Sequence, residues 1–262
     1  MMKAWEEFEI DATKHLNDTY GDLAEFTHDG GADSTIPDIY VKTNSGKAFY
    51  IEAKLSNAQC GQFVLQPDIK SSTFVYTAKN ARNKYADEII NYMNNDFEAF
   101  KEAGTAGKEI EMDQSVFANW IKMIYSKKNV KWFISEGFIL IPIDEFQNYF
   151  DIKAVYRVKR SGSSSVGKSK MNDIITYIKL SQVSASITDY KIEGDKLFVC
   201  SDKNIHNVRF VYNGYEYMFS KRDERYELRK LSNTFNANVI FSVSLKNKAD
   251  KYKDAFISCL KD

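Results

Sequence analysis

Two β-rich runs joined by a short turn place charged side chains at the ends of neighbouring strands. Residues 36–43 and 47–55 are rich in Ile, Val, Tyr and Phe, and an Asn-Ser-Gly turn separates them, which predicts a β-hairpin. Because side chains alternate along a strand, Glu52 and Lys54 fall on one face. Asp38 begins the partner strand, so the hairpin is expected to bring it close to Glu52.

These charges suit the hydrolysis of a phosphodiester. The run before Glu52 is apolar, so Glu52 and Lys54 end a strand that we expect to be buried, and buried charges need a partner or a metal ion. Carboxylate oxygens bind Mg²⁺, which polarises a phosphate and lowers the pKa of a bound water. A neighbouring lysine can orient or deprotonate the attacking water and offset the charge that develops on the phosphate.

The residues around this hairpin resemble a known family. Residues 30–38 (GGADSTIPD) together with residues 51–54 (IEAK) resemble the PD-(D/E)xK nuclease superfamily and, within it, the type II restriction endonucleases. The matching stretch runs over residues 5–66. The resemblance implies an α/β fold with a restriction-endonuclease-like mixed β-sheet core flanked by helices, to which this chain adds a β-rich C-terminal extension.

The resemblance also assigns roles to the residues of the motif. It implies that Asp38 and Glu52 bind Mg²⁺, with Ala53 as a further metal ligand. Lys54 would then be the catalytic lysine. Members of the superfamily cut DNA with Mg²⁺, so double-stranded DNA is the expected partner.

Two further side chains are predicted to complete the active site. Apolar residues at helical spacing predict an amphipathic helix that ends near Gly21, and Glu9 lies beside its apolar stripe. Family members often carry a Phe-Glu pair in this first helix, and Phe8-Glu9 matches it, so the resemblance implies a role for this carboxylate. Some members also place a glutamine near the site from the helix that follows the lysine; Gln62 or Gln59 would fill that position.

A competing motif lies further along the chain. Residues 162–169 (GSSSVGKS) fit the GxxxxGK[ST] pattern of a phosphate-binding P-loop, which requires a buried strand before it and a helix after it. A helix is expected over 171–178. The preceding run, 154–160, alternates apolar and basic residues, which is typical of a half-exposed strand and not of a central parallel one. A nucleoside-triphosphate-binding protein is kept as an alternative.

The same stretch is better explained as a DNA-binding clamp. Basic side chains at a strand end, followed by the hydroxyls and N–H groups of a Ser/Gly loop, are groups that bind phosphate oxygens. The stretch also resembles the Arg-x-Lys-x-Ser-Gly-Ser segments of some restriction endonucleases. The expected DNA contacts are Asp33, Ser34, Arg157, Lys159, Arg160, Ser161, Ser163 and Lys168.

Composition sets the outer limits. The chain has 36 acidic and 36 basic residues, so it carries no overall basic signature, and DNA affinity would depend on where the basic residues cluster. Three widely separated cysteines suggest neither a disulfide framework nor a zinc site. No signal peptide or membrane-length apolar run is present, so the protein is expected in the cytoplasm.

The remaining sequence predicts how the chain is organised. A helical region is expected over 81–123 and a β-rich region over 190–245, in which 209–219 is a hairpin with an Asn-Gly turn. We therefore expect a nuclease core over 1–150. A β-rich DNA-recognition region follows over 151–262, either separate or within the same compact domain.

The favoured hypothesis is a type II restriction endonuclease that makes Mg²⁺-dependent double-strand cuts at a specific DNA sequence. A homodimer is expected, because two-fold symmetry would bring one site to each strand of a palindromic target. A DNA-repair or junction-resolving nuclease of the same superfamily is the alternative. The large β-rich C-terminal part argues against it, since nucleases that read only the shape of DNA can be much smaller.

Overall fold

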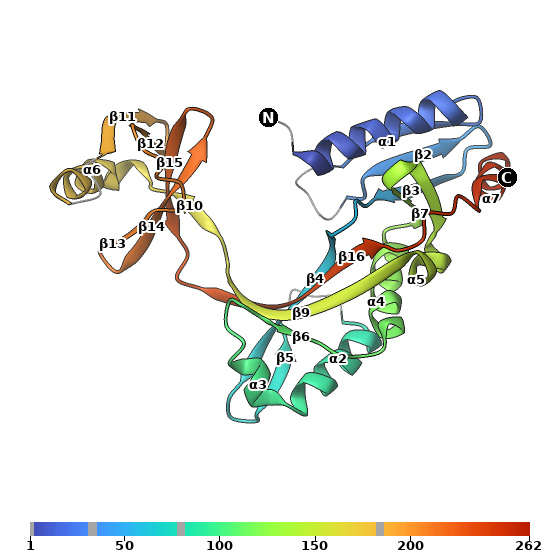
Figure 1. Cartoon of the computed structure of the whole chain (residues 1–262), viewed down its shortest axis with the longest axis horizontal. Helices are drawn as coiled ribbons and strands as arrows, with labels where there is room; N and C mark the ends of the chain where they lie inside the picture. The colour runs from blue at the N-terminus through green and yellow to red at the C-terminus, as the bar shows by residue number, and fades with distance from the viewer. Residues whose placement is uncertain (1–2, 31–35, 78–81, 182–185) are drawn as a thin grey trace. The chain divides into compact units, whose positions relative to one another are not determined.

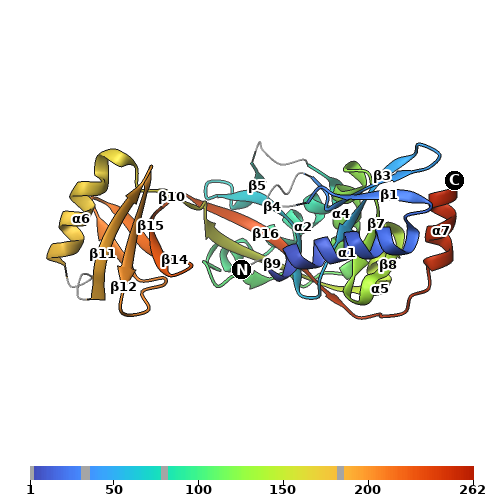
Figure 2. The same cartoon turned by 90° about the horizontal axis from the view of Figure 1, so that it is seen from above.

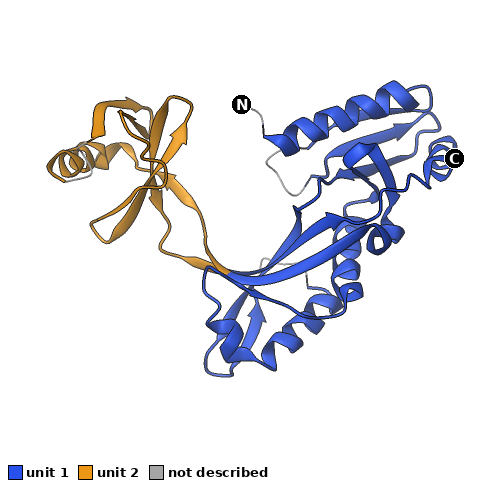
Figure 3. Cartoon of the chain, viewed as in Figure 1, with its two compact units in different colours: residues 1–157, 237–262 blue, residues 158–236 orange. Residues whose placement is uncertain are grey.

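The computed structural model describes residues 3–30, 36–77, 82–181 and 186–262 (Figure 1). Over these ranges the chain separates into two compact units (Figure 3). Unit 1 is Met1–Arg157 with Ala237–Asp262, and unit 2 is Val158–Asn236. The chain passes from unit 1 to unit 2 along β9 (Phe150–Arg160) and returns along β16 (Phe235–Leu245).

This division differs from the predicted boundary between 1–150 and 151–262. Residues 237–262 belong to unit 1 because β16 pairs with a strand of that unit, and its Val239 and Phe241 are fully buried in the core of that unit. The β-rich C-terminal part is therefore not one region. Unit 2 is an insertion within the chain of unit 1.

The first sheet of unit 1 has the strand order β1-β2-β3-β7-β8. Its strands are β1 (Ala24–His28), β2 (Ile39–Thr43), β3 (Ala48–Ala53), β7 (Val130–Ser135) and β8 (Ile139–Pro142). Strands β3 and β7 are parallel and the other neighbours are antiparallel, which confirms the predicted mixed sheet. The predicted hairpin is the β2–β3 pair, with Ile39 opposite Ile51.

Helices lie against both faces of this sheet, as the predicted fold class requires. On one face, α1 (Ala4–Tyr20) and α7 (Lys253–Lys261) bury Leu16 and Phe256 against β1, β2 and β3 (Figure 1). On the other face Phe133 of β7 belongs to a second core, which further helices share. These helices are α2 (Lys84–Asn94), α3 (Phe97–Lys101), α4 (Gln114–Lys127) and α5 (Phe146–Tyr149).

The second sheet of unit 1 has the order β5-β4-β16-β9-β6 and packs on the same second core. Its further strands are β4 (Ala58–Asp68), β5 (Thr73–Tyr76) and β6 (Lys108–Glu109). Strand β4 corrects the expectation that Gln62 would come from a helix after the lysine. Buried Cys60, Phe63 and Leu65 attach this segment to the core, and its pairing with β16 extends it as a strand.

Unit 2 is a sheet of order β11-β12-β15-β14-β13, with β10 also pairing β15 and helix α6 (Met171–Leu180) packed on it (Figure 2). Its strands are β10 (Ser163–Ser165), β11 (Ile187–Glu193), β12 (Lys196–Ser201), β13 (Arg209–Tyr212), β14 (Tyr215–Arg222) and β15 (Arg225–Leu231). The predicted Asn-Gly hairpin joins β13 to β14. Asn213 and Gly214 both have positive φ, 48° and 73°, as a two-residue turn of this kind requires.

Among the described helices, none is long and apolar enough to cross a membrane.

Candidate active site

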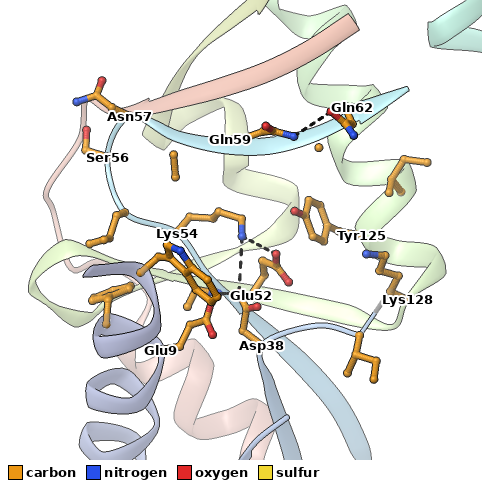
Figure 4. A pocket seen from close by; sticks show the side chains of 18 of the residues that line it. Glu9, Asp38, Glu52, Lys54, Ser56, Asn57, Gln59, Gln62, Tyr125 and Lys128 are labelled. Atoms are coloured by element: carbon orange, nitrogen blue, oxygen red, sulfur yellow. Dashed lines mark hydrogen bonds and ion pairs between the residues drawn. The ribbon is translucent and has the colours of Figure 1, made fainter. Parts of the chain in front are cut away.

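Three charged side chains of the motif converge at one end of the β2–β3 hairpin (Figure 4). Lys54 Nζ lies 2.6 Å from Glu52 Oε1 and 3.7 Å from Asp38 Oδ2. Asp38 Oδ2 also accepts a hydrogen bond of 2.9 Å from the N–H of Ala53. The three charged side chains are between 8% and 13% exposed, so the structure gathers them in a largely buried cluster.

The backbone around this cluster is held on both sides by neighbouring segments. The carbonyl of Asp38 accepts hydrogen bonds from the N–H groups of Asp29 (3.0 Å) and Gly30 (2.9 Å), which follow β1. At the end of β3, the N–H of Lys54 donates to the carbonyl of Ile134 at 2.9 Å, and Ser135 Oγ donates to the carbonyl of Lys54 at 2.6 Å. Both halves of the hairpin are therefore fixed where the charged side chains emerge.

Burial and close contact between the charged groups shift the pKa values of Asp38 and Lys54. Burial, and then the neighbouring Glu52 carboxylate, raise the pKa of Asp38 to about 7, although Lys54 acts in the opposite direction. Burial lowers the pKa of Lys54, but Glu52 and Asp38 outweigh this and raise it above its ordinary value. Lys54 is therefore an ammonium ion at neutral pH.

The donor set fits a hard divalent cation. Asp38 and Glu52 supply carboxylate oxygens and Ala53 a carbonyl at the end of the same strand, and such oxygen ligands suit Mg²⁺. A cation there would relieve the repulsion that raises the pKa of Asp38. In the described ranges no group of three or more His, Cys, Asp or Glu side chains could by itself hold a metal ion, so water would have to complete the coordination.

The cluster lies in the wall of a cavity of about 620 Å³ that also includes the other predicted catalytic residues. Glu9, on α1, is only 6% exposed, and its Oε2 lies 3.0 Å from His28 Nε2. Gln62, on β4, is exposed and its Oε1 accepts a 3.3 Å hydrogen bond from Gln59 Nε2. The structure thus brings the predicted catalytic side chains to one cavity, from α1, the hairpin and β4.

Two residues of this region carry no signal in the sequence. His28, which binds Glu9, follows no spacing that marks a site. Tyr125 lines the cavity from α4 and is 6% exposed, yet its position in the sequence indicates only a buried helix face. It reaches the cavity because β3 and β7 pair in parallel and α4 immediately precedes β7.

The predicted DNA contacts around β9 and β10 have different surroundings. Arg160 forms an ion pair with Glu216 (2.6 Å) and lies 5.2 Å from the centre of the Phe235 ring. The Ser161 hydroxyl is hydrogen-bonded to those of Ser232 and Thr234. These two residues are thus already engaged within unit 2.

Of the remaining predicted DNA contacts, some are bonded within the protein and others are exposed. Ser163 Oγ accepts a 3.2 Å hydrogen bond from Arg229 Nε, whereas Lys159 and Lys168 are exposed. Arg157 belongs to unit 1, and its buried Nε has no hydrogen-bond partner among the described residues. Asp33 and Ser34 lie outside the described residues.

The segment 162–169 does not form a P-loop. Ser163–Ser165 is strand β10, paired antiparallel with β15, where a P-loop would form a phosphate-cradling turn. The preceding strand β9 pairs antiparallel with β6 and alternates buried and more exposed residues along its first half. Residues 162–169 therefore lack the P-loop that the nucleotide-binding alternative requires, although its expected helix is present as α6.

Comparison with solved structures finds a likeness to an endonuclease along the full chain, which shows that this chain belongs to the restriction endonucleases. The similar structure is HhaI endonuclease in complex with DNA. It shares 37% sequence identity and a TM-score of 0.83, over 99% of this chain and 100% of that one. No protein-family model and no curated protein matches the chain.

Proposed function

We propose that the protein is a type II restriction endonuclease, which makes Mg²⁺-dependent double-strand cuts at a specific DNA sequence. The observation that carries this proposal is the buried cluster of Asp38, Glu52 and Lys54 in the wall of the cavity. The likeness to HhaI endonuclease, solved with DNA, supports DNA as the substrate. The same cluster supports the PD-(D/E)xK assignment, because its residues come from the two halves of that motif.

The residues of the cluster then take separate roles. Asp38, Glu52 and the Ala53 carbonyl would hold Mg²⁺, which would polarise the scissile phosphate and lower the pKa of the attacking water. Lys54 is kept charged by the two acids. From its place beside both acids, Lys54 can orient or deprotonate the attacking water and offset the charge on the phosphate.

The wall of the cavity supplies further polar groups. Glu9 is the additional carboxylate, and its contact with His28 orients it. Gln62 places an amide at the cavity, where it can donate a hydrogen bond to a phosphate oxygen.

The proposed function is tested by incubating the protein with unmethylated phage DNA in Mg²⁺ and in EDTA, beside Asp38→Ala. Discrete fragments that require Mg²⁺ and are absent with the variant are expected. Uncut DNA under all conditions would reject a restriction endonuclease and direct the search to branched DNA substrates. Cutting that survives the loss of Asp38 would reject the assigned site.

The exposed lysines of unit 2 are expected to bind phosphate and not bases. We expect Lys168→Gln to weaken DNA binding equally on all sequences and to lower the slope of log affinity against log salt by about one, because one phosphate contact is lost. Fluorescence anisotropy between low and moderate salt measures this. Lys179→Gln, an exposed lysine on α6, is the control and should leave the slope unchanged; equal slopes for Lys168→Gln and the wild type would contradict the contact.

The homodimer stays a prediction, and the course of plasmid cleavage tests it. A dimer with one site per strand should convert supercoiled plasmid to the linear form with little nicked circle at saturating protein, because both strands are cut in one binding event. Gel electrophoresis of a time course, with sedimentation of the protein–DNA complex beside it, provides the measurement. Accumulation of nicked circles by a one-to-one complex would contradict the homodimer.

A further inference from the structure

The carboxylate of Glu9 has a partner outside the motif, at the end of β1. Glu9 lies on α1, lines the cavity and is buried. Its Oε2 lies 3.0 Å from Nε2 of His28, which is the last residue of β1. An ionised carboxylate only accepts hydrogen bonds, so the imidazole is the donor. The side chain of Glu9 is therefore held by a second element of the chain.

The two residues that follow His28 bind the main chain of Asp38. The N–H groups of Asp29 and Gly30 donate to the carbonyl of Asp38 at 3.0 Å and 2.9 Å. His28 itself belongs to a strand that pairs with β2, so this end of β1 is fixed against the strand that begins the hairpin. Three consecutive residues thus hold Glu9 through a side chain and Asp38 through the backbone.

The absence of a side chain at Gly30 allows Glu9 and Asp38 to come close together. A Cβ at this position would lie 2.8 Å from Glu9 Oε2, 3.1 Å from His28 Nε2 and 3.0 Å from Asp38 Cα. The space that one methyl group would fill is therefore bounded by both acidic residues. In agreement with this proximity, the charge of Glu9 raises the pKa of Asp38, after the larger effects of burial and Glu52.

Glu9 can reach the proposed metal ion only through water. Within the described parts of the chain it forms no group with two further acidic, His or Cys side chains that could hold an ion directly. Mg²⁺ usually keeps several of its waters in protein sites. Because Oε2 of Glu9 is bound by His28, Oε1 is the oxygen left to accept a hydrogen bond from such a water.

We propose that His28 is a positioning residue that holds Glu9 beside Asp38, so that both carboxylates act on one metal ion. Asp38 binds the ion directly and Glu9 binds one of its waters. This rests on the proposed metal site and adds a residue that the motif does not contain. Partners of this kind orient the groups around metal ions in many proteins. His28 acts through Glu9 and is assigned no contact with the substrate.

The test compares two substitutions of His28. His28→Leu removes the hydrogen-bond donor, whereas His28→Gln keeps a side-chain N–H that can bind Glu9. Glu9→Ala, alone and combined with His28→Leu, shows whether His28 acts through Glu9. His15→Leu is the matched control, because His15 is a half-buried histidine of α1 whose ring stacks on Phe138, with 4.3 Å between the ring centres.

Binding of Mn²⁺ to the free protein is measured by isothermal titration calorimetry, and single-turnover cleavage is measured against Mg²⁺ concentration. We expect His28→Leu to bind Mn²⁺ about 10-fold more weakly than the wild type and to need correspondingly more Mg²⁺ for half-maximal cleavage. His28→Gln should recover most of the affinity, and His15→Leu should match the wild type. DNA affinity in EDTA should be unchanged in all of these variants.

The double variant separates a positioning role from a general structural one. It should bind Mn²⁺ no more weakly than Glu9→Ala alone, because His28 then has no carboxylate to position. An unchanged Mn²⁺ affinity in His28→Leu, or losses that add in the double variant, would overturn the positioning role.

The metal titration also separates this inference from the proposed function. A wild-type protein that binds Mn²⁺ but cuts no DNA would reject the restriction endonuclease, while the affinities of the variants would still decide the role of His28. A wild-type protein that binds no Mn²⁺ would reject the positioning role itself.

Discussion

We expect Lys54→Met to cut DNA about 10²–10³-fold more slowly than the wild type, the usual cost of removing one group that stabilises charge in a transition state. The ammonium is buried against both carboxylates of the site, and exposed lysines elsewhere cannot take its place. Met has a similar length without the charge, so the cavity keeps its shape. Single-turnover cleavage with excess protein measures the chemical step without product release.

Two comparisons show whether the slower cleavage by Lys54→Met reflects the chemical step itself. DNA affinity of Lys54→Met in EDTA and its thermal unfolding should stay close to those of the wild type, which would exclude a binding or folding defect. Lys54→Arg keeps a positive charge in a larger, planar group, so recovery of part of the rate would indicate that charge is the main contribution. A Lys54→Met variant within tenfold of the wild type would contradict the role of Lys54.

The second large effect concerns stability and pH. Burial and the Glu52 carboxylate raise the pKa of Asp38 from 3.8 to about 7. A group with a raised pKa contributes stability below its unfolded value and loses that contribution as pH rises through the folded value. The metal-free protein should therefore lose stability between about pH 4 and pH 7, by up to about 4 kcal/mol.

Asp38→Asn should remove this loss. The amide stays neutral and its oxygen can still accept the hydrogen bond from the N–H of Ala53. We expect the free energy of unfolding of the variant, relative to the wild type, to rise by about 2–3 kcal/mol between pH 5 and pH 8. Urea unfolding in EDTA at both pH values measures this change, and Mg²⁺ at pH 8 should stabilise the wild type but not the variant.

An exposed aspartate provides the control. A hydrogen bond from the Ser71 hydroxyl, together with the N–H of Lys70, lowers the pKa of Asp68. The contribution of Asp68 to folding stability is therefore present at pH values above its usual pKa and is lost only at lower pH. Asp68→Asn should change stability equally at pH 5 and pH 8. A constant difference between Asp38→Asn and the wild type across the same range would mean that Asp38 is not strained.

Much of the site was predictable because its parts are local in the sequence. Alternating residues and a short turn specify the β2–β3 hairpin, and its pairing alone carries Asp38 to Glu52 and Lys54. Helical spacing likewise placed Glu9 beside the buried stripe of α1. The Asn213-Gly214 turn was predictable for the same reason, because neighbouring residues determine its conformation.

The sequence by itself thus determined the β2–β3 hairpin, helix α1 and the charged cluster, whose residues lie within one hairpin. Only the tertiary structure decided where unit 2 begins and ends, that β4 is a strand, and that Tyr125 of α4 lines the cavity. Each of these depends on pairing between distant segments: β16 with β4, and β7 with β3. A local pattern of apolar residues shows which face is buried, but the partner that buries it is selected by packing across the whole unit.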